Sequence, residues 1–177
     1  DAVFVGGTLA NTFLAAHGIS VGDSIYESEA TNDIQKHFLR SKKIILPFDA
    51  VVSKTRGARG IFEVERGEKI FDVGTLTTRM LLGLARDART IIWNGPLGYI
   101  AGGYTQSTET LLRGLARLKN TKVIIGGGDT VAVLDRLGIH RRFFHVSTGG
   151  GAMLDFLVDG TLPGIDALVA AQKKMLY

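Results

Sequence analysis

Short apolar runs rich in Val and Ile alternate along the chain with longer segments that mix apolar and polar residues at helical spacing. Glycine, proline or aspartate separates most of these runs from the segment that follows. Strands that alternate with amphipathic helices are typical of a parallel sheet that carries helices on both faces. The pattern therefore predicts an α/β fold, with a three-layer, Rossmann-like, doubly wound parallel sheet formed by a single domain over residues 1–177.

The same pattern places the individual elements. The expected strands are residues 2–7, two pieces of 43–53 divided by Pro47, and 89–96. The expected helices are residues 8–18, 28–41, 76–88, 107–119 and a last one near 165–175. Two further segments, 122–138 and 142–158, each consist of a strand, three glycines and a helix. Between residues 54 and 72 we expect a loop with a short antiparallel strand near 61–64.

Local signals refine two of these helices. Thr8 is a candidate N-cap of the helix over 8–18, and Gly18 is a plausible stop, since glycine readily adopts the left-handed conformation after a helix. Leu111, Leu115 and Leu118 lie at helical spacing and predict one apolar face for the helix over 107–119.

Glycine is the compositional outlier, with 23 of 177 residues against about 7% in average soluble domains. The glycines gather at the ends of apolar runs, and at least four expected strands end in glycine or in Asn-Gly-Pro. In an open parallel sheet ligands bind beyond the carboxyl ends of the strands. We therefore expect these junctions to face one binding site.

Charge and cysteine content narrow the classes of function. The net charge of +4 is mild, and the densest basic run, residues 54–59, contains no aromatic side chain for base stacking, so we expect no nucleic-acid binding. The chain has no cysteine, which excludes disulfides and thiolate chemistry, and its four histidines have no metal-like spacing. No apolar stretch is long enough to span a membrane. We expect a cytoplasmic monomer.

The stretch VIIGGGDTVAVL, residues 123–134, joins an apolar strand to a helix through three glycines and an acid. The first amide groups of a helix lack intrahelical partners and attract anions, and glycines let phosphate oxygens approach the backbone. Asp129 would repel a bare phosphate, so it is either a helix cap or a ligand of Mg²⁺ that accompanies a nucleotide. A tight turn with a capping acid is the structural alternative.

The stretch STGGGAML, residues 147–154, repeats this arrangement with a helix expected from about Ala152. Two such loops in one chain favour phosphate handling. One loop could hold a bound phosphate, while the other stabilises a group in transfer, because phosphoryl transfer depends mainly on positioning and preorganised donors.

Five segments, in this order and spacing, strongly resemble phosphoglycerate kinase. They are GGTLANTFL (6–14), LPFDAVV (46–52), WNGPLG (93–98), GGGDTVAVL (126–134) and STGGGAMLDFL with LPGIDAL (147–168). The resemblance covers nearly all of the chain, but only the carboxyl-terminal, nucleotide-binding domain of that family. It implies a two-domain hinge enzyme of glycolysis that uses Mg²⁺ and reversibly transfers a phosphoryl group from 1,3-bisphosphoglycerate to ADP, giving 3-phosphoglycerate and ATP.

The resemblance also implies roles for individual residues. The adenine pocket would involve Gly6, Gly7, Ile25 and Gly74, and the turn beside the nucleotide would be formed by Asn94 and Gly95. The nucleotide phosphates would be held by Gly127, Gly128, Asp129 and Thr130, with Asp129 at the metal. The phosphoryl group in transfer would be stabilised by the amides of Gly149, Gly150 and Gly151.

Two positions depart from the family. Ala101 stands where the family usually has a glutamate that binds the nucleotide ribose, which predicts altered ribose recognition unless Tyr99 or Tyr104 compensates. Thr75-Leu76 replaces a common Pro-Lys pair after Gly74.

The family's phosphoglycerate-binding domain, and the strand and loop that should precede Asp1, are absent from the sequence. Because transfer needs both substrates held in line, we expect the chain alone to bind nucleotide weakly and not to turn over. The alternatives are a noncatalytic nucleotide-binding module of the same fold, and an unrelated doubly wound domain that binds another phosphorylated ligand.

Overall fold

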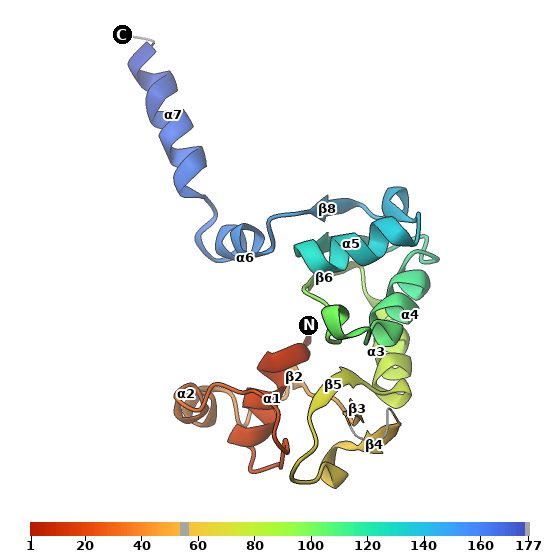
Figure 1. Cartoon of the computed structure of the whole chain (residues 1–177). Helices are drawn as coiled ribbons and strands as arrows, with labels where there is room; N and C mark the ends of the chain where they lie inside the picture. The colour runs from red at the N-terminus through yellow and green to blue at the C-terminus, as the bar shows by residue number, and fades with distance from the viewer. Residues whose placement is uncertain (54–56, 176–177) are drawn as a thin grey trace.

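The computed structural model describes residues 1–53 and 57–175 and has an α/β architecture (Figure 1). Its parallel strands form two hydrogen-bonded groups. In the smaller group β1 (Val3–Phe4) pairs with β2 (Ile44–Ile45). In the larger group the order is β6 (Thr90–Asn94), β7 (Lys122–Gly126) and β8 (His145–Ser147). The parallel strands and their helices confirm the predicted fold class.

Helices follow the strands as the pattern predicts. They are α1 (Gly7–Ala16), α2 (Thr31–His37), α3 (Thr75–Asp87), α4 (Gln106–Leu115), α5 (Gly128–Arg136), α6 (Gly150–Asp159) and α7 (Pro163–Met175). Three short 3-10 turns complete the list, namely η1 (Ile61–Glu63), η2 (Ile100–Gly102) and η3 (His140–Arg142). In Figure 1 α7 projects away from the rest of the molecule. None of the described helices is both long and apolar enough to cross a membrane.

A small antiparallel sheet joins β3 (Asp49–Val52) to β4 (Ala58–Gly60) on one side and to β5 (Ile70–Val73) on the other. The antiparallel strand expected near residues 61–64 lies instead at β4, and residues 61–63 form η1. Part of the loop expected over 54–72, residues 54–56, lies outside the described residues.

The largest apolar core lies beneath β6 and β7, where α3, α4 and α5 pack against the larger sheet. Leu111 and Leu115 of α4 are buried there, and Leu118 packs against the same cluster just beyond the helix end. This confirms the predicted apolar face. Two smaller clusters form around α1, one with α2 and β2 and one with β3 and η1.

The ends of α1 separate a correct prediction from a wrong one. Gly18 follows the helix with a φ of +73°, which confirms it as the stop signal. Thr8 is not the cap, because the helix begins at Gly7 and Gly6 occupies the N-cap position. The chain leaves β1 through the two glycines and enters the helix directly, so Thr8 falls within the first turn.

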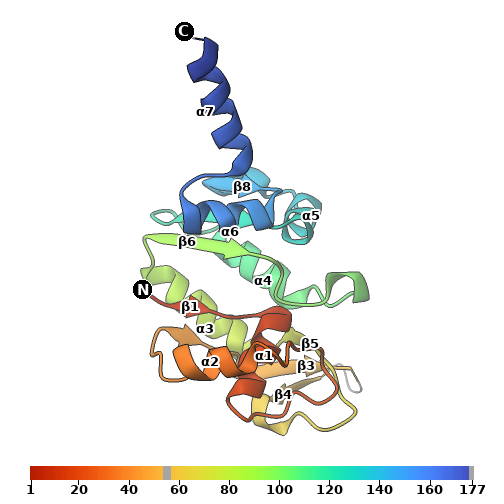
Figure 2. The ribbon, with the colours of Figure 1, turned by 90° about the vertical axis from the view of Figure 1, so that its left-hand side faces the viewer.

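The two groups of parallel strands do not pair with each other. In Figure 2 β1 lies on the side of α1 and α2, whereas β6 lies on the side of α5 and α6. Val3 of β1 is 55% exposed and Ile92 of β6 is 46% exposed, although parallel strands are normally covered on both faces. Among the described residues, the predicted sheet is thus divided between β1 and β6.

Candidate functional site

A groove of about 540 Å³ lies between the two groups of parallel strands. Its walls come from β1 and the start of α1, from β5, and from the turn that follows β6, with Asp129 of α5 at its edge. The volume is typical of a small-molecule site, and the position is the crevice at the ends of the strands where α/β proteins bind ligands.

The glycine pair after β1 forms one wall of this groove. Gly7 has a φ of +60°, and a side chain at Gly6 would press on Phe4 and on Leu97 of the turn beyond β6. Glycine therefore allows the start of α1 to approach the turn of residues 94–98 closely. Both glycines line the groove together with Asn94 and Gly95, and their predicted roles in nucleotide binding stay predictions.

Asn94 links the two glycine-rich loops. Its Nδ2 donates a hydrogen bond to the carbonyl of Gly150 over 3.2 Å. The amide of Gly95 donates to Gly126 and the amide of Gly127 donates to Ser147, so the ends of β6, β7 and β8 are joined in one layer. These three junctions therefore lie side by side, whereas their facing one binding site stays a prediction.

The close packing between the loops requires glycine at two positions. A Cβ at Gly150 would lie 2.7 Å from Asn94 Oδ1 and 2.9 Å from the Cα of Gly127. Gly127 has a φ of +97°, which L side chains rarely adopt, and it occupies the N-cap position of α5. The glycines thus bring two helix N-termini beside one asparagine.

Asp129 lies in the first turn of α5, two residues after the N-cap position. The capping interpretation of this residue is wrong, because Gly127 is the N-cap and the helix already begins at Gly128. The Asp129 carboxylate is exposed and borders the groove. It is therefore available to a ligand at the end of a helix whose free amides favour anions.

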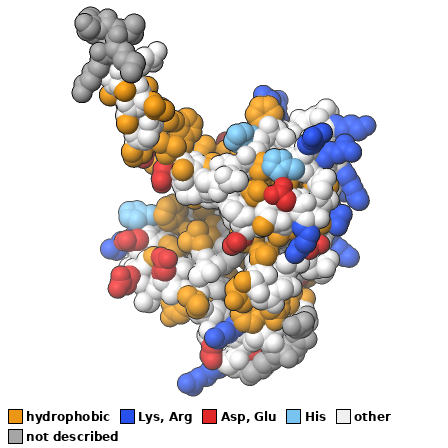
Figure 3. All heavy atoms as spheres, turned by 45° about the horizontal axis from the view of Figure 1, so that its top comes forward, with side chains coloured by type: hydrophobic (Ala, Val, Ile, Leu, Met, Phe, Trp, Pro, Cys, Tyr) orange, Lys and Arg blue, Asp and Glu red, His pale blue; other side chains and the backbone are white. Residues whose placement is uncertain are grey.

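Basic side chains do not contribute to this groove. Among its described lining residues there is no lysine or arginine. Figure 3 shows many of the Lys and Arg side chains along one outer edge of the molecule instead. A phosphate in the groove would meet backbone amides and the Asp129 carboxylate, and a cation would be needed between that carboxylate and the phosphate.

Several residues with predicted roles do not line the groove. Ile25 lies outside the groove and is 76% exposed. Thr130 is fully buried, and its Oγ1 has no hydrogen-bond partner among the described residues. The glycines at the starts of α5 and α6 do not line the groove either, namely Gly127, Gly128, Gly149, Gly150 and Gly151. Their roles in ligand binding stay predictions.

Gly74 has a structural partner that the sequence did not indicate. It is the N-cap of α3, and a Cβ there would lie 2.1 Å from Oδ2 of Asp49. The Asp49 carboxylate accepts hydrogen bonds from the amides of Leu76 and Thr77, both at 2.9 Å. Because Gly74 has no side chain, the buried Asp49 carboxylate can approach the first turn of α3 and accept its free amides. The role of Gly74 in an adenine pocket stays a prediction.

Asp72 is a second buried acid that sequence reasoning missed. It lines the groove and is only 3% exposed. Burial raises the pKa of Asp72 to about 6, although hydrogen bonds from the Ser107 and Val73 amides oppose this shift. An acid inside the apolar run IFDV is the signal that could have identified it, since such an acid needs backbone donors.

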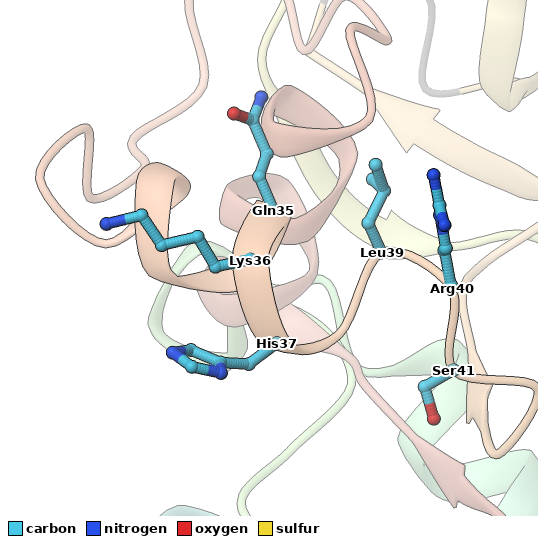
Figure 4. A pocket seen from close by; sticks show the side chains of 6 residues that line it. All are labelled: Gln35, Lys36, His37, Leu39, Arg40 and Ser41. Atoms are coloured by element: carbon cyan, nitrogen blue, oxygen red, sulfur yellow. The ribbon is translucent and has the colours of Figure 1, made fainter.

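A second pocket beside α2 lacks the features of a site. Figure 4 shows that the side chains of Gln35, Lys36 and His37 point in different directions, and they do not converge with Leu39 and Arg40 on one position. Within the described residues, no three His, Asp or Glu side chains form a cluster that could hold a metal on their own.

Comparison with known proteins identifies the family of this chain. The sequence model of the family described as phosphoglycerate kinase matches residues 1–160. The chain belongs to the phosphoglycerate kinase family. Phosphoglycerate kinase of Baumannia cicadellinicola is 38% identical over 98% of this chain and 46% of its own length. That of Levilactobacillus brevis is 35% identical over 95% of this chain and 44% of its own length.

Solved phosphoglycerate kinase structures have the same fold. The structure from Coxiella burnetii superposes with a TM-score of 0.83 at 37% identity and covers 94% of this chain and 46% of its own. The structure from Pyrococcus horikoshii has a TM-score of 0.80 at 26% identity. The chain spans about half the length of these relatives.

Proposed function

We propose that this chain is the nucleotide-binding part of a phosphoglycerate kinase, over residues 1–177. The complete enzyme would reversibly transfer a phosphoryl group between 1,3-bisphosphoglycerate and ADP in the cytoplasm, with phosphoglycerate held by a further domain. The observation that carries the proposal is the meeting of two glycine-rich helix starts at Asn94, beside the groove that Gly6 and Gly7 close. Family membership supports the same function.

The nucleotide would occupy the groove, with its phosphates toward the start of α5. The amides of Gly128, Asp129 and Thr130 are the first of α5, and the first amides of a helix have no intrahelical partners. The start of α6 at Gly150 would offer its amides to the phosphoryl group in transfer. Asn94 would fix the distance between these two anion-binding helix ends.

Asp129 fits a magnesium site of the kind that accompanies nucleotides. Mg²⁺ usually retains several waters and takes one or two carboxylates plus phosphate oxygens. One exposed carboxylate beside free helix amides is consistent with that donor set. When bound, Mg²⁺ would offset the negative charge that develops on the phosphates, and Asp129 would hold it at the start of α5.

Titration calorimetry with ADP, with and without Mg²⁺, tests the proposal. We expect Asp129→Asn to weaken binding of MgADP more than binding of metal-free ADP, because only the metal complex uses the carboxylate. Asp135→Asn is the matched control, since Asp135 is exposed on the same helix but far from its N-terminus. Absence of binding at millimolar MgADP would overturn the proposal.

A noncatalytic nucleotide-binding module is the second candidate, and Ala101 is the observation that favours it. This residue lines the groove and supplies no polar side chain. Turnover of the polypeptide that includes the phosphoglycerate-binding domain separates the two functions. Phosphoryl transfer from 1,3-bisphosphoglycerate to ADP supports the kinase, whereas MgADP binding without transfer supports the module.

A further inference from the structure

Tyr99 lies in an aromatic cluster on the wall of the groove. Its amide donates a 2.7 Å hydrogen bond to the carbonyl of Phe71 on β5. The ring centroids of Tyr99 and Phe71 lie 5.7 Å apart, and those of Tyr104 and Phe71 lie 4.8 Å apart. Backbone and ring contacts together fix the position of the Tyr99 side chain.

Gly102 packs closely against the same ring. A Cβ there would lie 2.3 Å from Cδ1 of Tyr99, a separation that a side chain could not tolerate without displacing the ring. Despite this packing, Tyr99 remains 54% exposed and borders the groove. One part of the ring is therefore held by the protein, while the rest is open to a ligand.

Hydroxyl-binding carboxylates are scarce at this end of the groove. Asp49 is engaged by the first amides of α3, and Asp72 accepts the amides of Val73 and Ser107. Asp129 belongs to the start of α5. The residue two positions beyond Tyr99 is Ala101, which also lines the groove. Among the described lining residues, the surface thus offers an aromatic face, and its acids other than Asp129 are engaged by backbone amides.

We propose that Tyr99 is the residue that holds the nucleobase in this chain. Its exposed ring stacks on the nucleobase, and binding does not depend on the 2′-hydroxyl of the ribose. This inference rests on the proposed nucleotide-binding function. Aromatic stacking uses the π-face that every base has, so it needs neither a carboxylate at position 101 nor a particular sugar hydroxyl.

Binding of MgADP and of its 2′-deoxy analogue to the chain tests the inference. We expect the two dissociation constants of the unaltered chain to agree within about threefold. If the protein bound the 2′-hydroxyl, the deoxy analogue would lose a neutral hydrogen bond of about 1 kcal/mol, which corresponds to more than a threefold difference. Tyr99→Leu should weaken both ligands by about tenfold, and Tyr99→Phe should bind both as the unaltered chain does, since stacking requires the ring.

Two further variants sharpen the test. Ala101→Glu places a carboxylate beside the ring and should create a preference for MgADP over the deoxy analogue. Phe62→Leu is the matched control, because Phe62 is 80% exposed and lies outside the groove. Circular dichroism and thermal unfolding confirm that each variant is folded.

The outcomes separate this inference from the proposed function. If MgADP binds the unaltered chain and Tyr99→Leu equally well, or if the deoxy analogue binds the unaltered chain more than about threefold weaker, Tyr99 does not hold the nucleobase as proposed and the nucleotide site remains. If neither ligand binds the unaltered chain at millimolar concentration, the proposed function fails and this inference fails with it.

Discussion

Replacing Asp49 with alanine should cost this chain much of its stability. The carboxylate is 3% exposed and accepts the amides of Leu76 and Thr77 at 2.9 Å, together with the Thr77 hydroxyl at 2.6 Å. Hydrogen bonds to a charged group contribute about 1.5–3 kcal/mol each, and removal of the acceptor leaves the buried donors without partners. We expect a loss of about 4 kcal/mol, against a total of about 5–15 kcal/mol for a domain.

Urea unfolding, followed by the fluorescence of the single tryptophan Trp93 on β6, measures this loss. Asp49→Asn should lose about half as much, because its amide oxygen can still accept the Thr77 bonds while its NH₂ group meets the Leu76 amide. Asp87→Ala removes an exposed acid from the C-terminal turn of α3, where the helix dipole disfavours it, so it should not destabilise the chain. A loss below about 1 kcal/mol for Asp49→Ala would refute the reasoning.

Two further predictions concern pH and the open edge of β6. Because the folded pKa of Asp72 is raised to about 6 from 3.8, its contribution to stability is complete below pH 3.8 and is lost as the pH rises through 6. Asp72→Asn should remove this component, worth about 3 kcal/mol, and parallel pH profiles of unfolding for both proteins would contradict it. In β6 every second backbone amide points toward β7, and the hydrogen bond from the Gly95 amide to Gly126 shows which ones do. Amide hydrogen exchange measured by NMR should therefore be slow at Ile91 and Trp93, whose amides point toward β7, and fast at Ile92, whose amide points away from it. Equal protection at all three amides would show that the free edge of β6 is paired.

The strand-to-helix junctions could be predicted because their signals are local. An apolar run, a group of glycines and an amphipathic segment occupy adjacent positions, and the structure has a strand and a helix on either side of Gly127 and of Gly149. The identity of the N-cap residue of each helix is harder to predict from the sequence than the junction itself. Thr8 and Asp129 have the usual chemistry of a cap, but glycines occupy the N-cap positions before both helices. Backbone conformation, rather than side-chain chemistry, decides those two starts.

The walls of the groove depend on contacts between distant parts of the chain. Asp49 satisfies amides that lie 27 and 28 residues further along, and Asp72 accepts an amide 35 residues away. Such partners leave no trace in local periodicity, although an acid within an apolar run indicates that some partner exists. The division of the parallel strands between β1 and β6 is equally invisible, because each strand has the composition of a fully covered strand.

The charge around the groove bears on how this chain would hold the nucleotide of the proposed function. A helix N-terminus supplies about half a positive charge, which is small against a nucleotide diphosphate. No lysine or arginine among the described lining residues adds to it, and Asp129 subtracts from it. In the proposed site, a divalent cation between Asp129 and the phosphates would reverse the sign of that last contribution, so the acid would favour the metal complex and disfavour the bare nucleotide. Metal dependence of binding is therefore the property in which this site should differ most from a phosphate loop that carries its own lysine.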